Sequence, residues 1–248
     1  MTVDRKKSRF HAYVKKHKSY FGTPLTGPML EYGCGAGGFL IEAHANNIAC
    51  HGVEVVEMRQ KQFRDKIAAE KKAHLDDFFH LYGGEILPFN TGYFNAVYSW
   101  FVMEHVGHVW TSLREIVRVL KPGGTIFIAT QDARNCYEGH ADKPWPPFLP
   151  LSLIPPYLDE LGYEPDYIEY VCQEVFYVTA PQMTSTLRAL GCEIIYESAD
   201  PDPTYLEAIN IQTDAEIRAF ARRVKTLIET NAWERPKENA IIYARKLT

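Results

Sequence analysis

Four glycines within six residues separate a short apolar segment from a helical one, and this feature constrains the fold more than any other. The stretch LEYGCGAGGFL spans residues 30 to 40 and contains Gly33, Gly35, Gly37 and Gly38. Glycine has no Cβ, so the backbone can turn sharply between a strand and a helix and can approach a ligand closely. The segment therefore predicts a strand, a tight binding loop for a ligand of the nucleoside type, and the start of a helix.

The rest of the chain alternates short β-rich segments with longer segments of helical period. Strands are predicted at ACHGVEV, FFHLY, FNAVYSW and GTIFIAT, and a later helix (TAPQMTSTLRAL), strand (CEIIYES), helix (about residues 214 to 231) and strand (NAIIYARKL) complete the pattern. Such alternation builds a mostly parallel sheet with helices on both faces. The sequence therefore predicts a single α/β domain over residues 1 to 248, with the apolar last strand inside the sheet.

Residues 131 to 178 interrupt this alternation. The segment is rich in proline and aromatic residues and includes NCYEGHADKPWPPFLPLSLIPPYLDELGYEPDYIEY. Long irregular segments inside a compact domain are usually functional. We therefore interpret it as an insertion that covers the binding site of the second substrate.

The composition excludes several classes of protein. The net charge of -4 gives no general attraction for nucleic-acid phosphates. No apolar run reaches the roughly 20 residues of a membrane span, and the N-terminus lacks the apolar stretch of a secretory signal. The five cysteines are scattered without a CxxC pair, which argues against a disulfide framework and a zinc site. We therefore expect a cytoplasmic protein with no nucleic-acid partner, no membrane partner and no metal centre.

The glycines alone fit two kinds of cofactor. Gly33, Gly35 and Gly38 match the GxGxxG pattern of dinucleotide sites, and Glu54 ends the second strand, where such a site places its ribose-binding acid. Glu31 lies two residues before the first glycine. Its carboxylate favours a cofactor with the positively charged amino group of a methionine moiety, since a nicotinamide cofactor offers no such group.

Further markers follow in order: GGEILPFNTGYFNAV, VMEHV and RVLKPGGTIFIAT. With the glycine loop and its two acids, they make the chain resemble the class I S-adenosylmethionine-dependent methyltransferases, closely over about residues 29 to 130 and loosely over about the last seventy. The resemblance implies a Rossmann-like sheet of seven strands, mostly parallel with an antiparallel last strand. It also implies S-adenosylmethionine as the cofactor and S-adenosylhomocysteine as its product.

On this resemblance, the cofactor contacts lie at the ends of the early strands. Glu31 and the glycine loop would surround the methionine part, while Glu54 would bind the ribose hydroxyls. Val55 would pack on the adenine, and Glu85 would replace an aspartate that relatives often carry before LPF. The implied cofactor residues are Glu31, Gly33, Cys34, Gly35, Gly37, Glu54, Val55, Glu85, Ser99 and Trp100.

Methyl transfer from a sulfonium is an in-line displacement, so the enzyme mainly holds donor and acceptor in a reactive geometry. A hydroxyl acceptor also needs a nearby base, whereas an unprotonated amine does not. Candidate groups follow the fourth and fifth strands, at the sheet edge where open α/β folds bind ligands. They are Glu104, His105 and His108 after the fourth strand, and Tyr137, Glu138, His140, Asp142, Lys143 and Trp145 after the fifth.

His140 is the predicted general base, with His105 as a second candidate and with Glu138 or Asp142 as the group that orients His140. Two alternatives stay open: His140 only makes local hydrogen bonds, and His105 only shapes the pocket. The residues expected to contact the acceptor are Tyr20, Glu104, Tyr137, Glu138 and Trp145.

Residues 1 to 24 are basic and aromatic. We interpret them as a helical lid over the cofactor, with Tyr13 or Tyr20 reaching into the site. A solvated helix face and an RNA-binding patch are the alternatives, and the acidic remainder of the chain disfavours the second.

Together these features predict a methyltransferase that methylates a hydroxyl of a small molecule or a glycan, with a histidine general base. N-methylation of a small amine or heterocycle is the main alternative. An NAD-dependent oxidoreductase and a non-catalytic S-adenosylmethionine-binding module also stay open. The sequence does not identify the acceptor or the oligomeric state.

Overall fold

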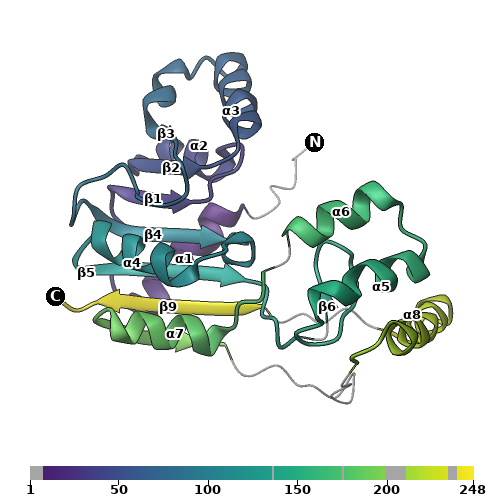
Figure 1. Ribbon diagram of the computed structural model, residues 1–248. Coiled ribbons are helices and arrows are strands. Elements are labelled where there is room, and N and C mark those ends of the chain that lie inside the picture. The colour runs from purple at the N-terminus through teal and green to yellow at the C-terminus, as the bar shows by residue number, and fades with distance from the viewer. Residues whose placement is uncertain (1–7, 136, 175, 199–210, 234–238) are drawn as a thin grey trace.

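The computed structural model describes residues 8–135, 137–174, 176–198, 211–233 and 239–248. Its centre is a seven-stranded sheet in the order β3-β2-β1-β4-β5-β9-β8 (Figure 1). Strands β1 to β5 are parallel, and β9 is antiparallel to both of its neighbours. The predicted fold class is therefore confirmed, including the antiparallel last strand. The strands are β1 (Met29–Tyr32), β2 (Cys50–Glu54), β3 (Phe79–Leu81), β4 (Phe94–Trp100), β5 (Leu120–Thr130), β8 (Cys192–Glu197) and β9 (Ala240–Lys246).

Helices cover both faces of this sheet. Successive strand residues point to opposite sides, and apolar side chains on both sides need to be covered. Ile126 and Ile128 of β5 belong to the apolar core beneath α4 and α7, whereas Phe127 and Ala129 belong to the core beneath α1, α2 and α3. The helices of the first core are α4 (Val109–Val119) and α7 (Ala180–Ala189); those of the second are α1 (Arg9–Phe21), α2 (Gly38–Ala45) and α3 (Glu57–Ala69). Short 3-10 turns η1 (Ala73–Phe78) and η2 (Met103–His105) precede β3 and α4.

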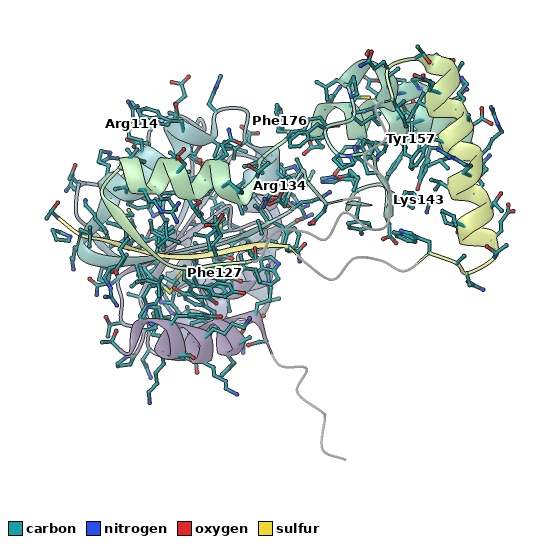
Figure 2. The ribbon with its side chains drawn as sticks, turned by 90° about the horizontal axis from the view of Figure 1, so that it is seen from below. Arg114, Phe127, Arg134, Lys143, Tyr157 and Phe176 are labelled. Atoms are coloured by element: carbon teal, nitrogen blue, oxygen red, sulfur yellow. The ribbon has the colours of Figure 1, made fainter. Side chains whose placement is uncertain are left out.

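Beside the sheet lies a helical cap with a core of its own (Figures 1 and 2). Its helices are α5 (Ile154–Leu161), α6 (Pro165–Glu174) and α8 (Asp214–Glu229). Tyr157, Val171 and Phe220 are fully buried among them. A small hairpin of β6 (Tyr137–Glu138) and β7 (Lys143–Pro144), followed by the turn η3 (Leu151–Leu153), leads into the cap. The cap therefore combines the segment after β5 with a second segment between β8 and β9.

The segment expected to be an irregular insertion thus contains two helices. Pro155 and Pro156 follow Ile154 in the first turn of α5, where a missing N–H breaks no helical hydrogen bond and the fixed φ suits a helix. Gly162 ends that helix in the left-handed region, with φ of 89°. The prolines that suggested a break in the sequence pattern therefore start a helix.

The N-terminal helix α1 is a packed layer of the domain. Phe10, Tyr13 and Phe21 are buried against the sheet, and Tyr13 lies between Tyr98 and Phe127. Tyr20 stacks on Tyr243, with ring centroids 4.1 Å apart. The expectation that Tyr13 or Tyr20 reaches the ligand is therefore corrected, because both rings contribute to the core; residues 1–7 of the expected lid lie outside the described residues. Within the described ranges, no helix is long and apolar enough to cross a membrane.

Candidate functional site

A cleft of about 1030 Å³ lies at the carboxyl ends of β1, β2 and β4. The sheet order places β2 on one side of β1 and β4 on the other, so the chain leaves these strands in opposite directions. Open α/β sheets bind ligands at such a switch point. The wall opposite the strands comes from α6, through Tyr170, Gln173 and Glu174. The cleft thus lies between the sheet and the cap.

The glycine loop forms the floor of this cleft. Gly33 has a φ of 74°, and a Cβ at this position would lie 2.2 Å from Cγ2 of Val102. Gly35 has a φ of 53°, and no atom lies within 4 Å of the place its Cβ would occupy. Gly33 is therefore needed for backbone geometry and for packing, whereas Gly35 leaves open space towards the cleft.

Two other loop residues have roles that differ from the expectation. A Cβ on Gly37 would lie 2.3 Å from Cδ2 of Phe63, so this glycine allows α2 to pack against α3 and does not line the cleft. The thiol of Cys34 packs against Gly52 of β2. Burial raises the pKa of this thiol well above its ordinary value, so the group stays protonated. Cys34 therefore faces a ligand only through its backbone.

Glu31 places a buried carboxylate in the cleft. Only 3% of the residue is exposed, and its Oε2 accepts a hydrogen bond from the backbone N–H of Leu40 at 3.2 Å. Burial raises the pKa of Glu31 to about 8, although the charge of Arg9, which also lines the cleft, opposes the shift. A buried acid with so high a pKa favours a cationic partner, because a positive charge stabilises its ionised form.

Glu54 closes the other side of the glycine loop. Its Oε2 accepts from the N–H of Gly35 at 2.8 Å, and its Oε1 accepts from the N–H of Val55 at 2.8 Å and of Val56 at 3.1 Å. The end of β2 is thereby tied to the loop after β1. Val55 leaves 54% of its surface exposed and lines the cleft, so it offers a bare apolar surface to a flat ring.

Three further predicted cofactor residues divide between the cleft and the core. Glu85 and Trp100 line the cleft, after β3 and at the end of β4. Ser99 does not line it: the residue is fully buried within β4, paired with Tyr32 on β1 and with Ile128 on β5. The predicted contact at Ser99 is therefore corrected, because only the last residue of the strand reaches the cleft edge.

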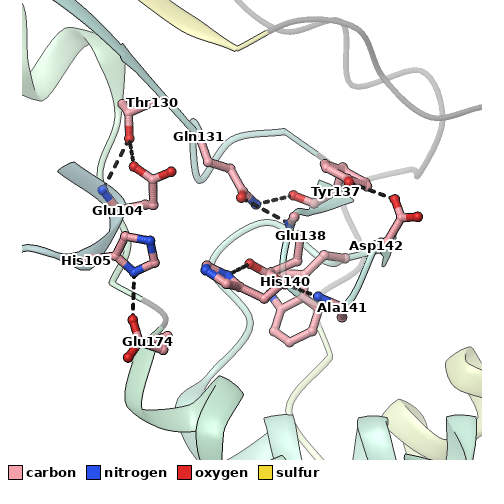
Figure 3. A network of polar contacts seen from close by, with 12 residues as sticks. Glu104, His105, Thr130, Gln131, Tyr137, Glu138, His140, Ala141, Asp142 and Glu174 are labelled. Carbon is pink, nitrogen blue, oxygen red and sulfur yellow. Dashed lines mark hydrogen bonds and ion pairs between the residues drawn. The ribbon is translucent and has the colours of Figure 1, made fainter. Parts of the chain in front are cut away.

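The insertion brings a histidine and an acid to the edge of the cleft (Figure 3). Nδ1 of His140 lies 2.6 Å from Oε1 of Glu138, and Oε2 of Glu138 accepts from the N–H of Ala141 at 2.7 Å. Glu138 is buried, whereas His140 lines both the large cleft and an adjoining cavity of about 20 Å³. The hydrogen bond to Glu138 raises the pKa of His140 above its ordinary value. Since Nδ1 is occupied, Nε2 is the nitrogen available to a ligand.

The loop that carries this pair is held by side chains that the sequence did not single out. Nε2 of Gln131 donates to the carbonyl of Tyr137 at 2.7 Å, and its Oε1 accepts from the N–H of Gly139 at 3.0 Å. From the cap, the hydroxyl of Tyr167 donates to the carbonyl of His140, and that of Tyr163 donates to the carbonyl of Ala141. These bonds fix the backbone on both sides of the imidazole.

His105 faces His140 from the end of β4. The two rings meet edge to face, with centroids 4.9 Å apart. Nδ1 of His105 lies 2.9 Å from Oε2 of Glu174, the last residue of α6, which makes a polar contact between sheet and cap (Figure 3). Glu174 was absent from the predicted site, since a single acid at the end of a helix carries no motif. The structure thus brings His105 and His140 together across 35 positions of the sequence.

Glu104 lies beneath this pair and is buried. Its carboxylate accepts a hydrogen bond from the hydroxyl of Thr130. The backbone N–H of Glu104 donates to the oxygen of that hydroxyl at 3.2 Å. Burial raises the pKa of Glu104. Glu104 therefore joins the ends of β4 and β5 and also lines the smaller cavity.

Tyr137 and Trp145, two of the predicted acceptor residues, line the smaller cavity. The hydroxyl of Tyr137 donates to Asp142 at 2.8 Å, and Nε1 of Trp145 donates to the hydroxyl of Tyr177 at 3.3 Å. Asp142 thus pairs with Tyr137, and Glu138 is the acid that contacts His140. Among the described residues, no group of three or more His, Cys, Asp and Glu side chains could hold a metal ion.

Comparisons with known proteins agree with this arrangement. Residues 5–197 match the model of a methyltransferase domain family. The chain is 33% identical over 121 residues to the chloroplastic tocopherol O-methyltransferase of Arabidopsis thaliana, which covers 47% of this chain and 34% of that protein. It is 27% identical over 159 residues to the 27-O-demethylrifamycin SV methyltransferase of Amycolatopsis mediterranei (strain S699), with 58% and 57% covered. The chain thus spans only part of the length of each of these relatives.

The fold matches over a greater length. The crystal structure of an S-adenosylmethionine-dependent methyltransferase from Mesorhizobium loti superposes with a TM-score of 0.58 at 18% identity, covering 96% of this chain and 98% of that one. At this identity the match supports the fold, and the family rests on the family model. The chain is therefore a member of the methyltransferase domain family, within the class I S-adenosylmethionine-dependent methyltransferases.

Proposed function

We propose that this protein transfers the methyl group of S-adenosylmethionine to a hydroxyl of a small molecule or sugar, with His140 as the general base. The observation that supports this most is the Glu138–His140 pair, with its 2.6 Å contact, at the junction of the large cleft and the smaller cavity. A base is needed for a hydroxyl acceptor and is dispensable for an unprotonated amine. The pair therefore favours O-methylation over N-methylation.

The cleft has the groups that this cofactor requires. Glu31 is a buried acid without a cationic partner at ion-pair distance among the described residues, and it suits the amino group of the methionine moiety. Gly35 leaves room for close approach, Glu54 suits the ribose hydroxyls, and the exposed surface of Val55 suits the adenine. Bound in this cleft, the cofactor supplies an electrophilic methyl group on a positively charged sulfur.

The chain's own residues would then handle the proton. Glu138 holds the imidazole of His140 through Nδ1, which leaves Nε2 to accept the proton of the acceptor hydroxyl. The imidazolium that forms is stabilised by the adjacent carboxylate of Glu138. With the cofactor bound, the acceptor oxygen would take its methyl group as the proton moves to Nε2 of His140, and His140 would then release that proton to solvent.

The two relatives support the acceptor class, because one is a tocopherol O-methyltransferase and the other is a 27-O-demethylrifamycin SV methyltransferase. The test is methyl transfer from labelled S-adenosylmethionine into a host extract that holds both metabolites and polysaccharides. The labelled product is then isolated, and the atom that carries the methyl group is identified by mass spectrometry and NMR. We expect a methyl ether. A methyl group on nitrogen or carbon would contradict the proposed base chemistry.

A further inference from the structure

The cavity beside His140 is acidic. Glu104, Glu138 and Glu174 converge there from η2, β6 and α6, around His105 and His140, and these five residues are termed the acidic chamber (Figure 3). Among the described residues that line the smaller cavity there is no lysine or arginine. Arg134, a near neighbour in sequence, lines neither cavity and pairs with Asp132 at 2.7 Å.

The cations of the cleft lie at its other end. Arg9, Arg59 and Lys66 line the cleft, and the charges of Arg9 and Lys66 act on Glu31 at the cofactor end. Positive groups therefore lie near the expected position of the methionine moiety, and negative groups lie where an acceptor meets His140. A charged acceptor would experience this asymmetry strongly, because charge interactions are only weakly screened in a cleft.

Building on the proposed function, we propose that the acceptor is an uncharged hydroxyl compound and that Glu174 excludes acidic acceptors. An anionic acceptor would meet three acidic side chains and no lysine or arginine in the acidic chamber. Both carboxylate oxygens of Glu138 are taken by His140 and Ala141, and Glu104 is engaged by Thr130. Glu174 has 36% of its side chain exposed and lines both cavities, so it is the acid that an entering acceptor meets.

The aromatic lining fits such an acceptor. Phe176 is 43% exposed and lines both cavities, so it presents an apolar ring beside the polar groups, whereas Tyr137 and Trp145 are buried in the wall of the smaller cavity. This combination binds the CH faces of sugars and the rings of neutral phenols without requiring a charge. The surrounding carboxylates also disfavour a free alkoxide, so the acceptor proton passes to His140 while the methyl group is transferred.

The test separates acceptors by charge before the reaction. A host extract is divided on an anion exchanger into a neutral fraction and an acidic fraction, and each is offered to the protein with labelled S-adenosylmethionine. Wild-type protein is expected to label the neutral fraction at least about tenfold more than the acidic one, as charge exclusion predicts. Glu174→Gln and Glu174→Lys should raise labelling of the acidic fraction, with the larger rise for lysine.

Glu169→Gln is the matched control, because it removes the same charge from an exposed position on α6 that does not line either cavity. It should keep the wild-type preference. Labelling of the acidic fraction by wild-type protein would overturn the charge inference and leave the methyltransferase proposal standing. Labelling of neither fraction, with no binding of S-adenosylhomocysteine, would overturn both.

Discussion

The two ends of the cleft draw their residues from very different lengths of chain. At the cofactor end, Glu31, the glycine loop and Glu54 lie within 24 positions, and backbone hydrogen bonds tie them together. At the acceptor end, Glu104, His140 and Glu174 span 71 positions and meet only because the cap packs beside the sheet. The first end is a local motif and the second is a product of tertiary packing. Changes at one end should therefore leave the other largely intact.

The largest effect is expected from His140→Ala. Loss of a general base usually slows proton transfer by about 10²- to 10⁴-fold, and kcat should fall by that amount. The dissociation constant of S-adenosylhomocysteine should stay within about twofold, because no cofactor residue changes. Steady-state kinetics and calorimetry measure the two quantities. His74→Ala, at an exposed position away from both cavities, is the control. An unchanged kcat in His140→Ala would show that His140 is not the general base.

Glu31→Gln should have the opposite pattern, because it should weaken cofactor binding and leave kcat nearly unchanged. Removing one member of a buried charge pair costs about 2–5 kcal/mol, so the dissociation constant of S-adenosylhomocysteine should rise at least about thirtyfold. At saturating cofactor, kcat should change much less. Calorimetry measures the affinity, and Glu57→Gln at the exposed start of α3 is the matched control. Equal affinities in the variant and the wild type would show that Glu31 does not hold the amino group.

The high pKa of Glu31 also predicts that protons are released when the cofactor binds. With a pKa of about 8, the side chain is mostly protonated at pH 7 in the free protein, and pairing with an ammonium group requires its ionised form. Cofactor binding at pH 7 should therefore release most of one proton to the buffer. Calorimetry in buffers of different ionisation enthalpy measures this number. Wild type and Glu31→Gln should differ by nearly the whole amount, and equal release in both would refute the assignment.

The Glu138–His140 pair predicts a pH dependence of turnover. The base must be neutral, so kcat should rise as the pH rises through the pKa of His140, which lies above the ordinary 6.5. Glu138→Gln removes the cause of the raised pKa, and the acidic limb of the profile should move to lower pH. An unchanged pH profile in Glu138→Gln would show that Glu138 does not set the pKa of the catalytic base. The ion pair also stabilises the folded state below pH 6.5, and this stability is lost as the pH rises through the raised pKa.

The smallest effect is expected from Tyr167→Phe, which removes the hydroxyl that holds the carbonyl of His140. One hydrogen bond contributes about 1 kcal/mol to the free energy of unfolding, and kcat should fall by only a few-fold. Denaturant unfolding and kinetics check this. The decrease in kcat should disappear when the variant is combined with His140→Ala, because the hydroxyl acts only through that histidine. Additive effects in the double variant would contradict a positioning role.

The same contrast explains how much of the site was predictable. The sequence placed Glu31, the glycine loop and Glu54 at one cleft because they lie in neighbouring segments of a recognisable motif. It placed His140 at the edge of the sheet because an unusual loop follows a strand end. Glu174 gave no such signal, because it reaches His105 only through packing of α6 on the rest of the cap. Ser99 and Tyr20 were misplaced because a sequence does not show which residue of a strand reaches its edge or which face of α1 is buried.

The fold was predictable to a greater extent, since alternation of strands and helices determines a doubly wound sheet. The helical cap was not predictable from the sequence, because its apolar residues pack against one another from segments that are far apart in the chain. Tyr157 of α5 lies against Phe220 of α8, 63 positions later, with ring centroids 5.8 Å apart. No local period reveals a pair of that kind, and the two prolines at the start of α5 resemble a break.

The central claim is that the glycine loop with Glu31 holds S-adenosylmethionine and not a dinucleotide. Calorimetric titration of the wild-type protein with S-adenosylhomocysteine and, separately, with NADH tests it most directly. We expect saturable one-to-one binding of S-adenosylhomocysteine and no heat of binding with NADH. Binding of NADH without binding of S-adenosylhomocysteine would contradict it.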